Sequence, residues 1–283
     1  MLLSIVVLLL AACGGNQGEV QGPADAAAVA QPTDLQMAVV TDDFGVGTPR
    51  VPFVLYDGPE PAEDVEAVQL TAFDLDTKPP TATWQGQALN FSDYEVPYWV
   101  AYPEVPEAGF WGFQAQITRA DGTQTMAQFT IEVKERSQSP AVGEAAPPSE
   151  NRTLADGVAI SALTSGQDPI PALYEQTVAE ALAADKPLVV TLATPAFCQT
   201  RICAPVVRSV ETVFQKYDGE ANFIHLEIYK DFESLTPADE VEEWRLTSEP
   251  WTFVVDAEGR VAARLGGPVS ARELEAALTP LLP

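Results

Sequence analysis

The distribution of apolar residues divides the chain into two halves with different periods. Between residues 35 and 133, short apolar runs alternate with Pro, Gly and Asp, as in β-strands joined by turns. The clearest run, 111–117, alternates strictly between apolar and polar positions, which predicts a strand with one buried face. Asp121-Gly122 then predicts a hairpin turn into a strand at 126–133. Further strands are predicted at 51–58, 65–73 and 97–102.

This pattern predicts an all-β N-terminal domain. Several short strands over about a hundred residues favour an immunoglobulin-like sandwich of two packed sheets. The region contains no Cys, no His and no cluster of carboxylates spaced as metal ligands. Its aromatic residues Trp84, Trp99 and Trp111 are therefore interpreted as core.

From about residue 153 the pattern becomes one of helices alternating with buried strands. Helices are predicted at 172–184, 203–217 and 236–244, and a last one after the capping box formed by Ser270 and Glu273. Strands are predicted at 188–192, 223–228, 251–255 and 260–263. The predicted order is β-α-β, then a helix, a β-hairpin and a final helix.

Two segments rich in Pro, Gly and small residues bound these domains. Residues 13–34 are predicted to be a flexible tether and residues 136–152 a linker. The β-domain is then expected at 35–135, and the α/β domain at 153–283.

The first twelve residues are almost entirely apolar and too few to cross a bilayer as a helix, which is typical of a signal peptide over 1–12. Leu10-Ala11-Ala12-Cys13 resembles the lipobox of bacterial lipoproteins. In that family the chain is cut before the Cys, and the sulfur of the Cys carries a lipid. The resemblance implies an extracytoplasmic protein anchored to the cell membrane by lipid at Cys13.

The formal net charge is -26, from 41 acidic and 15 basic residues. Binding to nucleic acid is excluded as a function, because phosphate contacts need clustered Lys and Arg. The charge also disfavours electrostatic attachment to anionic lipid. The acidic residues are spread along the chain and are interpreted as a solvated surface.

Two cysteines remain, Cys198 and Cys203, and a pair so close in an exported chain is a candidate disulfide. Cys198 follows a predicted buried strand, and Cys203 begins a predicted helix, which resembles the thioredoxin family. The segment from Pro250 to Val261 resembles that family's cis-proline strand and hairpin. The resemblance covers residues 140–282 and implies a thioredoxin-like α/β domain.

The resemblance implies thiol–disulfide exchange with envelope proteins that carry thiols or disulfides, without a cofactor. Cys198 would attack and Cys203 would resolve the mixed disulfide. The positive end of a helix stabilises a thiolate, and Arg201 and Arg208 are expected to add to this effect. Pro250, with Glu249 before it, is expected to bind the partner chain.

The chain departs from the family at three positions. Four residues separate the cysteines where the family has two, and five positions on an ideal helix rotate a side chain by about 140°. A disulfide therefore requires Cys198 to lie in a non-helical turn. Leu192 stands near the place of the buried acid that carries protons in thioredoxins, and Phe197 replaces the usual Trp.

Three alternatives remain open. The same cysteine spacing occurs in one class of peroxiredoxin, but that family's Thr three residues before the Cys is Pro195 here. A Sco-like copper protein binds its metal with two cysteines and a His, which makes Cys198, Cys203 and His225 the alternative metal ligands. A purely structural disulfide would close only a tiny loop and stabilise the fold little.

Overall fold

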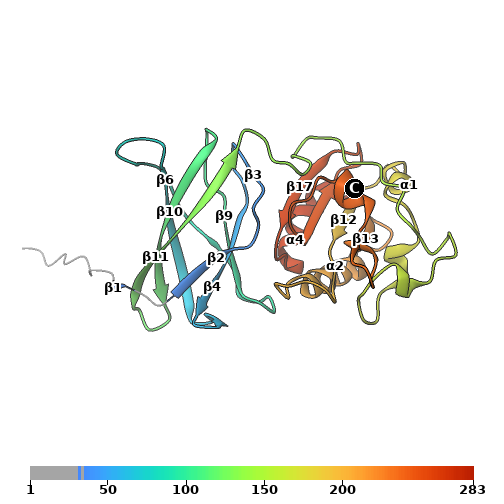
Figure 1. Cartoon of the computed structure of the whole chain (residues 1–283), viewed down its shortest axis with the longest axis horizontal. Helices are drawn as coiled ribbons and strands as arrows, with labels where there is room; N and C mark the ends of the chain where they lie inside the picture. Colours follow the sequence, from blue (N-terminus) through green and yellow to red (C-terminus); the bar gives the residue numbers. More distant parts are fainter. Residues whose placement is uncertain (1–30, 33–34) are drawn as a thin grey trace, which may run out of the picture.

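The computed structural model describes residues 31–32 and 35–283, which form two domains lying side by side (Figure 1). The predicted signal peptide, Cys13 and the tether up to residue 30 lie outside the described residues. Among the described helices, none has the length and apolar composition to cross a membrane.

The N-terminal domain consists of two facing β-sheets. One has the order β1-β11-β10-β6-β7, with β3 beside β11, and the other has the order β2-β4-β9-β8, with β5 beside β4. The strands are β1 (Gln31–Pro32), β2 (Leu35–Val39), β3 (Phe44–Gly45), β4 (Val51–Asp57), β5 (Glu60–Pro61), β6 (Val65–Asp74), β7 (Thr81–Gln87), β8 (Leu89–Phe91), β9 (Tyr98–Ala101), β10 (Gly109–Arg119) and β11 (Gln124–Lys134).

The core of this domain lies between the sheets. Trp111 and Phe113 of β10 pack there against Phe53 of β4, all three buried. The expectation that the tryptophans are core is confirmed for Trp99 and Trp111, whereas Trp84 is only partly buried against the same cluster. The predicted strands are all present because alternation along a strand directly reflects which face is buried.

The C-terminal domain is built on a four-stranded sheet with the order β13-β12-β16-β17. β12 runs parallel to β13 and antiparallel to β16, and β16 and β17 form a hairpin. This is the thioredoxin-like order that the resemblance implied. The elements are η1 (Ile160–Ala162), η2 (Pro171–Tyr174), α1 (Val178–Leu182), β12 (Leu188–Leu192), α2 (Cys203–Tyr217), β13 (Asn222–Leu226), β14 (Tyr229–Asp231), β15 (Thr236–Pro237), α3 (Asp239–Glu243), β16 (Trp251–Val255), β17 (Val261–Gly266), α4 (Ala271–Leu278) and η3 (Thr279–Leu281).

Helices cover both faces of this sheet. Val178 of α1 and Trp244 at the end of α3 pack with Val190 on one face. Val206 of α2 and Leu274 of α4 belong to the cluster on the other face. Burial on both faces explains why β12 is a continuous apolar run.

Two predicted helices are shorter than expected. The helix predicted at 172–184 is divided into η2 and α1, because the Thr177 hydroxyl accepts from the Glu180 N–H at 3.0 Å and starts a new helix. The predicted helix at 236–244 begins only at Asp239, since Thr236 and Pro237 pair with β14 instead.

The segment predicted as a linker, 136–152, packs along the C-terminal domain. The Gly143 N–H donates to the Val261 carbonyl at 2.8 Å, and the Val261 N–H donates to Glu144 at 2.9 Å. Ala146 is buried in the core of that domain. The linker therefore extends the hairpin edge of the sheet rather than separating the domains.

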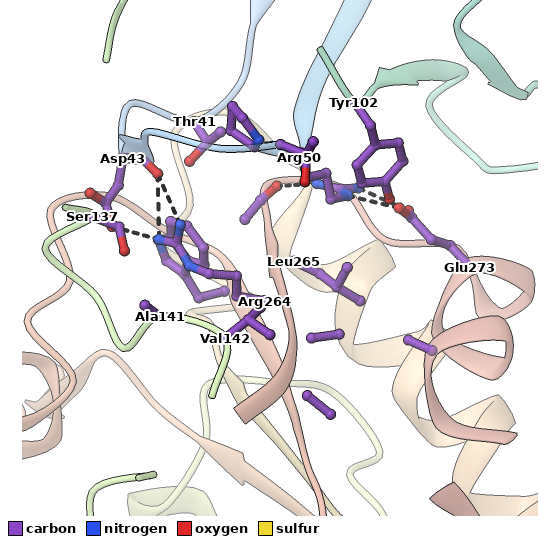
Figure 2. Close-up of a pocket in the computed structure, with 18 of the residues that line it drawn as sticks. Thr41, Asp43, Arg50, Tyr102, Ser137, Ala141, Val142, Arg264, Leu265 and Glu273 are labelled. Atoms are coloured by element: carbon purple, nitrogen blue, oxygen red, sulfur yellow. Dashed lines mark hydrogen bonds and ion pairs between the residues drawn. The ribbon is translucent and has the colours of Figure 1, made fainter. Parts of the chain in front are cut away.

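A buried ion pair joins the two domains. The Arg50 guanidinium donates to both carboxylate oxygens of Glu273, at 2.7 and 2.8 Å, and the two side chains are only 5% and 7% exposed (Figure 2). The expected capping box at α4 is half formed: the Ser270 hydroxyl accepts from the Glu273 N–H at 3.2 Å. The Glu273 carboxylate, however, faces Arg50, and the Ser270 N–H donates to the Tyr98 hydroxyl at 2.8 Å.

A second ion pair crosses the boundary beside a cavity of about 1160 Å³ that residues of both domains line (Figure 2). The Arg264 guanidinium donates to Asp43 at 2.7 Å, and Asp43 also accepts from the N–H and hydroxyl of Ser139. These hydrogen bonds and the positive charge hold the pKa of Asp43 below its usual range, although burial opposes them. The N-terminal domain, the linker and β17 thus meet at one carboxylate.

We expect Glu273→Leu to destabilise the protein by about 3–5 kcal/mol, because it leaves the buried Arg50 charge without its partner. The double variant Arg50→Met with Glu273→Leu is expected to recover a large part of that loss. Denaturant unfolding of the wild type, both single variants and the double variant measures the coupling. Losses that simply add in the double variant would show that the pair does not act as a unit.

Candidate dithiol site

The chain between β12 and α2 forms a loop that brings the two cysteines together. β12 ends at Leu192, Cys198 lies outside any helix, and α2 begins at Cys203. Arg201 has a φ of 60°, in the left-handed region, and its N–H donates to the Cys198 carbonyl at 3.4 Å. This reversal supplies the non-helical turn that the four-residue spacing requires.

Cys198 and Cys203 form a disulfide, with their Cα atoms 6.0 Å apart. Cys203 is fully buried against Ala193 and Val207, whereas Cys198 is only partly buried at the edge of the same cluster. The pairing predicted from the sequence is therefore present. The difference in burial makes Cys198 the more accessible of the two cysteines.

Polar groups around Cys198 differ from the expectation. The Thr200 hydroxyl lies 3.2 Å from the Cys198 sulfur, within hydrogen-bond distance. Arg208 forms an exposed ion pair with Glu95 of the β-domain. Arg201 is exposed.

Glu249 and Pro250 approach the cysteines from the neighbouring strand. Leu192 of β12 pairs with Trp251 of β16, so the residues before Trp251 lie beside the loop that follows β12. The Glu249–Pro250 peptide is cis, as the resemblance implied for Pro250. A carboxylate oxygen of Glu249 and the two cysteine sulfurs all lie within 4.8 Å of one another.

The Glu249 carboxyl group has an unusual environment. Its Oε2 is buried and accepts no hydrogen bond from the described residues, while the Thr194 N–H donates to the carboxylate. Burial, with a smaller contribution from the nearby charge of Glu227, raises the pKa of Glu249 to about 7, although the hydrogen bond from Thr194 opposes the shift. A carboxyl group with this pKa gains or loses a proton near neutral pH.

Glu249 corrects the expectation that the site lacks an acid. Leu192, at the position considered from the sequence, points into the hydrophobic core. The carboxyl group comes instead from the residue before the cis-proline, which sequence reasoning had assigned only to partner binding. The available signal was an acidic residue separated only by Pro250 from a strand that is buried throughout.

His225 does not take part in the site. Its Nδ1 lies 2.6 Å from the Tyr174 hydroxyl, and its Nε2 lies 3.0 Å from the Ala193 carbonyl. The ring is buried, which lowers the pKa of His225 below its usual value. Within the part of the chain that the structure describes, the side chains placed to share a metal ion are Cys198, Cys203 and Glu249, so the alternative ligand set with His225 is not assembled.

An aromatic cluster flanks the outer cysteine and was not anticipated from the sequence. Phe197 is 37% exposed, and its ring lies 5.7 Å from that of Phe232 and 6.1 Å from that of Tyr229. Tyr229 belongs to β14, and Phe232 follows that strand directly. The cluster forms an apolar surface beside Cys198.

Comparisons with known proteins give limited likeness. No family model matches the sequence, and no curated protein matches it. A thiol:disulfide interchange protein of the thioredoxin family from Chlorobium tepidum TLS is similar in structure, with 16% identity, a TM-score of 0.30, and coverage of 38% of this chain and 85% of that chain. CopC from Methylosinus trichosporium OB3b is similar with 13% identity, a TM-score of 0.25, and coverage of 33% of this chain and 84% of that chain. Likeness at this level carries no conclusion about chemistry.

Proposed function

We propose that this protein is an extracytoplasmic thiol–disulfide oxidoreductase that acts through Cys198 and Cys203. One observation carries the proposal: the partly exposed Cys198 and the buried Cys203 lie against the Glu249 carboxyl group, next to a cis-proline. The partners are envelope proteins that carry thiols or disulfides.

The first step joins the protein to its partner. In the reduced state, the Cys198 thiolate attacks one sulfur of a partner disulfide, and the partner's S–S bond breaks as the mixed disulfide forms. The second partner sulfur leaves as a thiolate and takes a proton from water. The N–H groups at the start of α2 and the Thr200 hydroxyl favour the Cys198 thiolate.

The second step releases the partner. Cys203 transfers its proton to the Glu249 carboxylate, and its thiolate then attacks the Cys198 sulfur. The mixed disulfide breaks, the partner leaves as a dithiol with two electrons gained, and the protein keeps the Cys198–Cys203 disulfide. A small thiol or a dithiol protein restores the reduced state, and the same steps in reverse oxidise a partner.

The surface around Cys198 suits an extended polypeptide. By its resemblance to the thioredoxin family, the Pro250 segment holds the partner chain against the cysteines. The exposed Phe197 ring offers a further apolar contact beside Cys198. This arrangement favours partners with an apolar side chain close to their cysteine.

The finer assignments of the N-terminal region are also proposals. We infer an immunoglobulin-like topology for the two-sheet domain and a lipid anchor at Cys13. A Cys13→Ser variant is expected to move from the membrane fraction to the soluble fraction. Membrane retention of that variant would exclude the lipid anchor.

Copper binding is the second candidate function, with a set of ligands that differs from the one expected from the sequence. The thiolates of Cys198 and Cys203 suit Cu(I), and Glu249 replaces His225 as the third group. Titration of the reduced protein with Cu(I) separates the candidates. Tight stoichiometric binding without exchange activity would favour copper.

We expect Cys198→Ser to abolish exchange with a disulfide-bonded peptide, and Cys203→Ser to accumulate the mixed disulfide. Both results follow if Cys198 attacks and Cys203 resolves. Mass spectrometry detects the adduct, and the wild-type pair is expected to have a reduction potential between about -120 and -270 mV. Full activity in Cys198→Ser would refute the proposal, and faster consumption of hydrogen peroxide than exchange would favour the peroxidase alternative.

The raised pKa of Glu249 predicts a pH-dependent stability. Between its usual value of 4.5 and about 7, the folded protein binds a proton that the unfolded chain has lost, so stability falls as pH rises through this window. Glu249→Gln lacks this term, so its stability relative to wild type should rise over the same window and level off above it. Thermal unfolding of the oxidised protein at several pH values measures the difference.

The matched control for this experiment is Glu258→Gln, which changes an exposed carboxylate on the β16–β17 hairpin. It is expected to follow the wild-type curve. Glu249→Gln should also slow release of the partner by about a hundredfold, the usual contribution of a positioned acid or base. A Glu249→Gln curve parallel to wild type, with an unchanged rate, would remove Glu249 from the proposed mechanism.

A further inference from the structure

The N-terminal domain binds the segment between β17 and α4, which faces it across the domain boundary (Figure 1). In addition to its ion pair with Glu273 (Figure 2), Arg50 donates to the Gly266 carbonyl at 2.6 Å and to the Pro268 carbonyl at 2.7 Å. The Arg50 side chain of the β-domain therefore makes hydrogen bonds to three residues of the C-terminal domain.

Tyr98 of β9 holds the end of the same segment. Its hydroxyl donates to the Glu273 carboxylate at 2.6 Å and accepts from the Ser270 N–H at 2.8 Å. The ring is fully buried and stacks on Phe91, with ring centroids 4.8 Å apart. Tyr98 thus has little freedom to move away from the segment.

The two backbones also approach closely at this boundary. Gly267 has a φ of 81°, and a Cβ atom placed on it would lie 2.8 Å from the Val40 carbonyl oxygen. A Cβ atom on Gly266 would lie 2.8 Å from the Thr41 hydroxyl. Only glycine allows the β-domain to rest so closely on residues 266–267.

Residues 266–267 in turn hold the cis-proline strand. The Gly267 N–H donates to the Pro250 carbonyl at 2.8 Å, and Gly266 pairs with Trp251. The Arg264 guanidinium, itself paired with Asp43, lies 4.8 Å above the Trp251 ring. A continuous series of hydrogen bonds therefore runs from Arg50 through the backbone of residues 266–267 to Pro250.

We propose that the β-domain positions the Pro250 segment for binding a partner polypeptide, with Arg50 and Tyr98 as the positioning residues. The inference rests on the proposed function, since it assigns the β-domain to the partner-binding surface of the dithiol site. Neither residue touches the reacting sulfurs. Their effect should therefore appear in the binding of a polypeptide along Pro250, and not in the reactivity of Cys198.

A neighbouring tyrosine offers a matched control. Tyr94 packs edge-on against Tyr98, with ring centroids 5.3 Å apart, and its buried hydroxyl makes no hydrogen bond to the residues that the structure describes. Tyr98→Phe and Tyr94→Phe thus remove the same atom from the same cluster. Only Tyr98→Phe breaks bonds to the segment between β17 and α4.

The test measures exchange of the full-length protein with two substrates: a short synthetic peptide closed by one disulfide, and glutathione disulfide. Tyr98→Phe should raise KM for the peptide about threefold to tenfold, the effect of losing one or two hydrogen bonds, and leave the rate with glutathione disulfide unchanged. Tyr94→Phe should leave both values at the wild-type level. The double variant Arg50→Met with Glu273→Leu should raise the peptide KM at least as much as Tyr98→Phe.

An unchanged peptide KM in both Tyr98→Phe and the double variant would overturn the inference. So would an equal loss with both substrates, because that result would place the effect at the cysteines themselves. Circular dichroism verifies that each variant is folded, and the conservative Tyr98→Phe keeps the test decisive if the double variant is unstable. A wild-type protein that exchanges with neither substrate would instead refute the proposed function.

Discussion

The relative position of the two domains depends on removing one carboxylate from water. Glu273 lies in the first turn of α4, where a negative charge is favourable, but its side chain is nearly inaccessible to solvent. A buried charge of this kind is tolerated only when donors surround it. Arg50 and Tyr98 supply those donors, and both come from the other domain. The charge on α4 thus requires the β-domain to stay in place.

The cost of burying a carboxylate also explains the dithiol site, but there the outcome is a carboxyl group that keeps its proton. Glu249 is also removed from water, but no cation compensates its charge, and one of its oxygens has no donor among the described residues. Its carboxyl group therefore keeps a proton to higher pH than usual. One buried glutamate pairs with Arg50 and holds the two domains together, whereas the other changes protonation near neutral pH beside the two cysteines.

Local burial could be predicted from the sequence, whereas long-range polar contacts could not. β12 and α2 have the bounds expected from their apolar patterns, because a buried strand or helix face restricts residue type position by position. The prediction of a capping box at Ser270 was only partly correct, because Arg50, 223 residues away in the sequence, binds the Glu273 side chain instead. Glu249 was missed as the acid because register between strands, not spacing in sequence, places it beside Cys203. The disulfide followed from the two closely spaced cysteines and the cis-proline from the family resemblance, while the aromatic cluster around Phe197 depends on the β14–β15 hairpin, which no pattern indicated.

The packed linker has a consequence for how this protein can be divided. Composition placed the domain boundary near residue 153, yet Ala146 fills part of the C-terminal core and residues 143–144 extend its hairpin edge. A gene segment that encodes only 153–283 would specify a domain with an open edge and a missing core side chain. The unit that recombination can transfer intact therefore begins before the linker. Because Asp43 and Arg50 also fasten that unit to the β-domain, the two halves are expected to be inherited together.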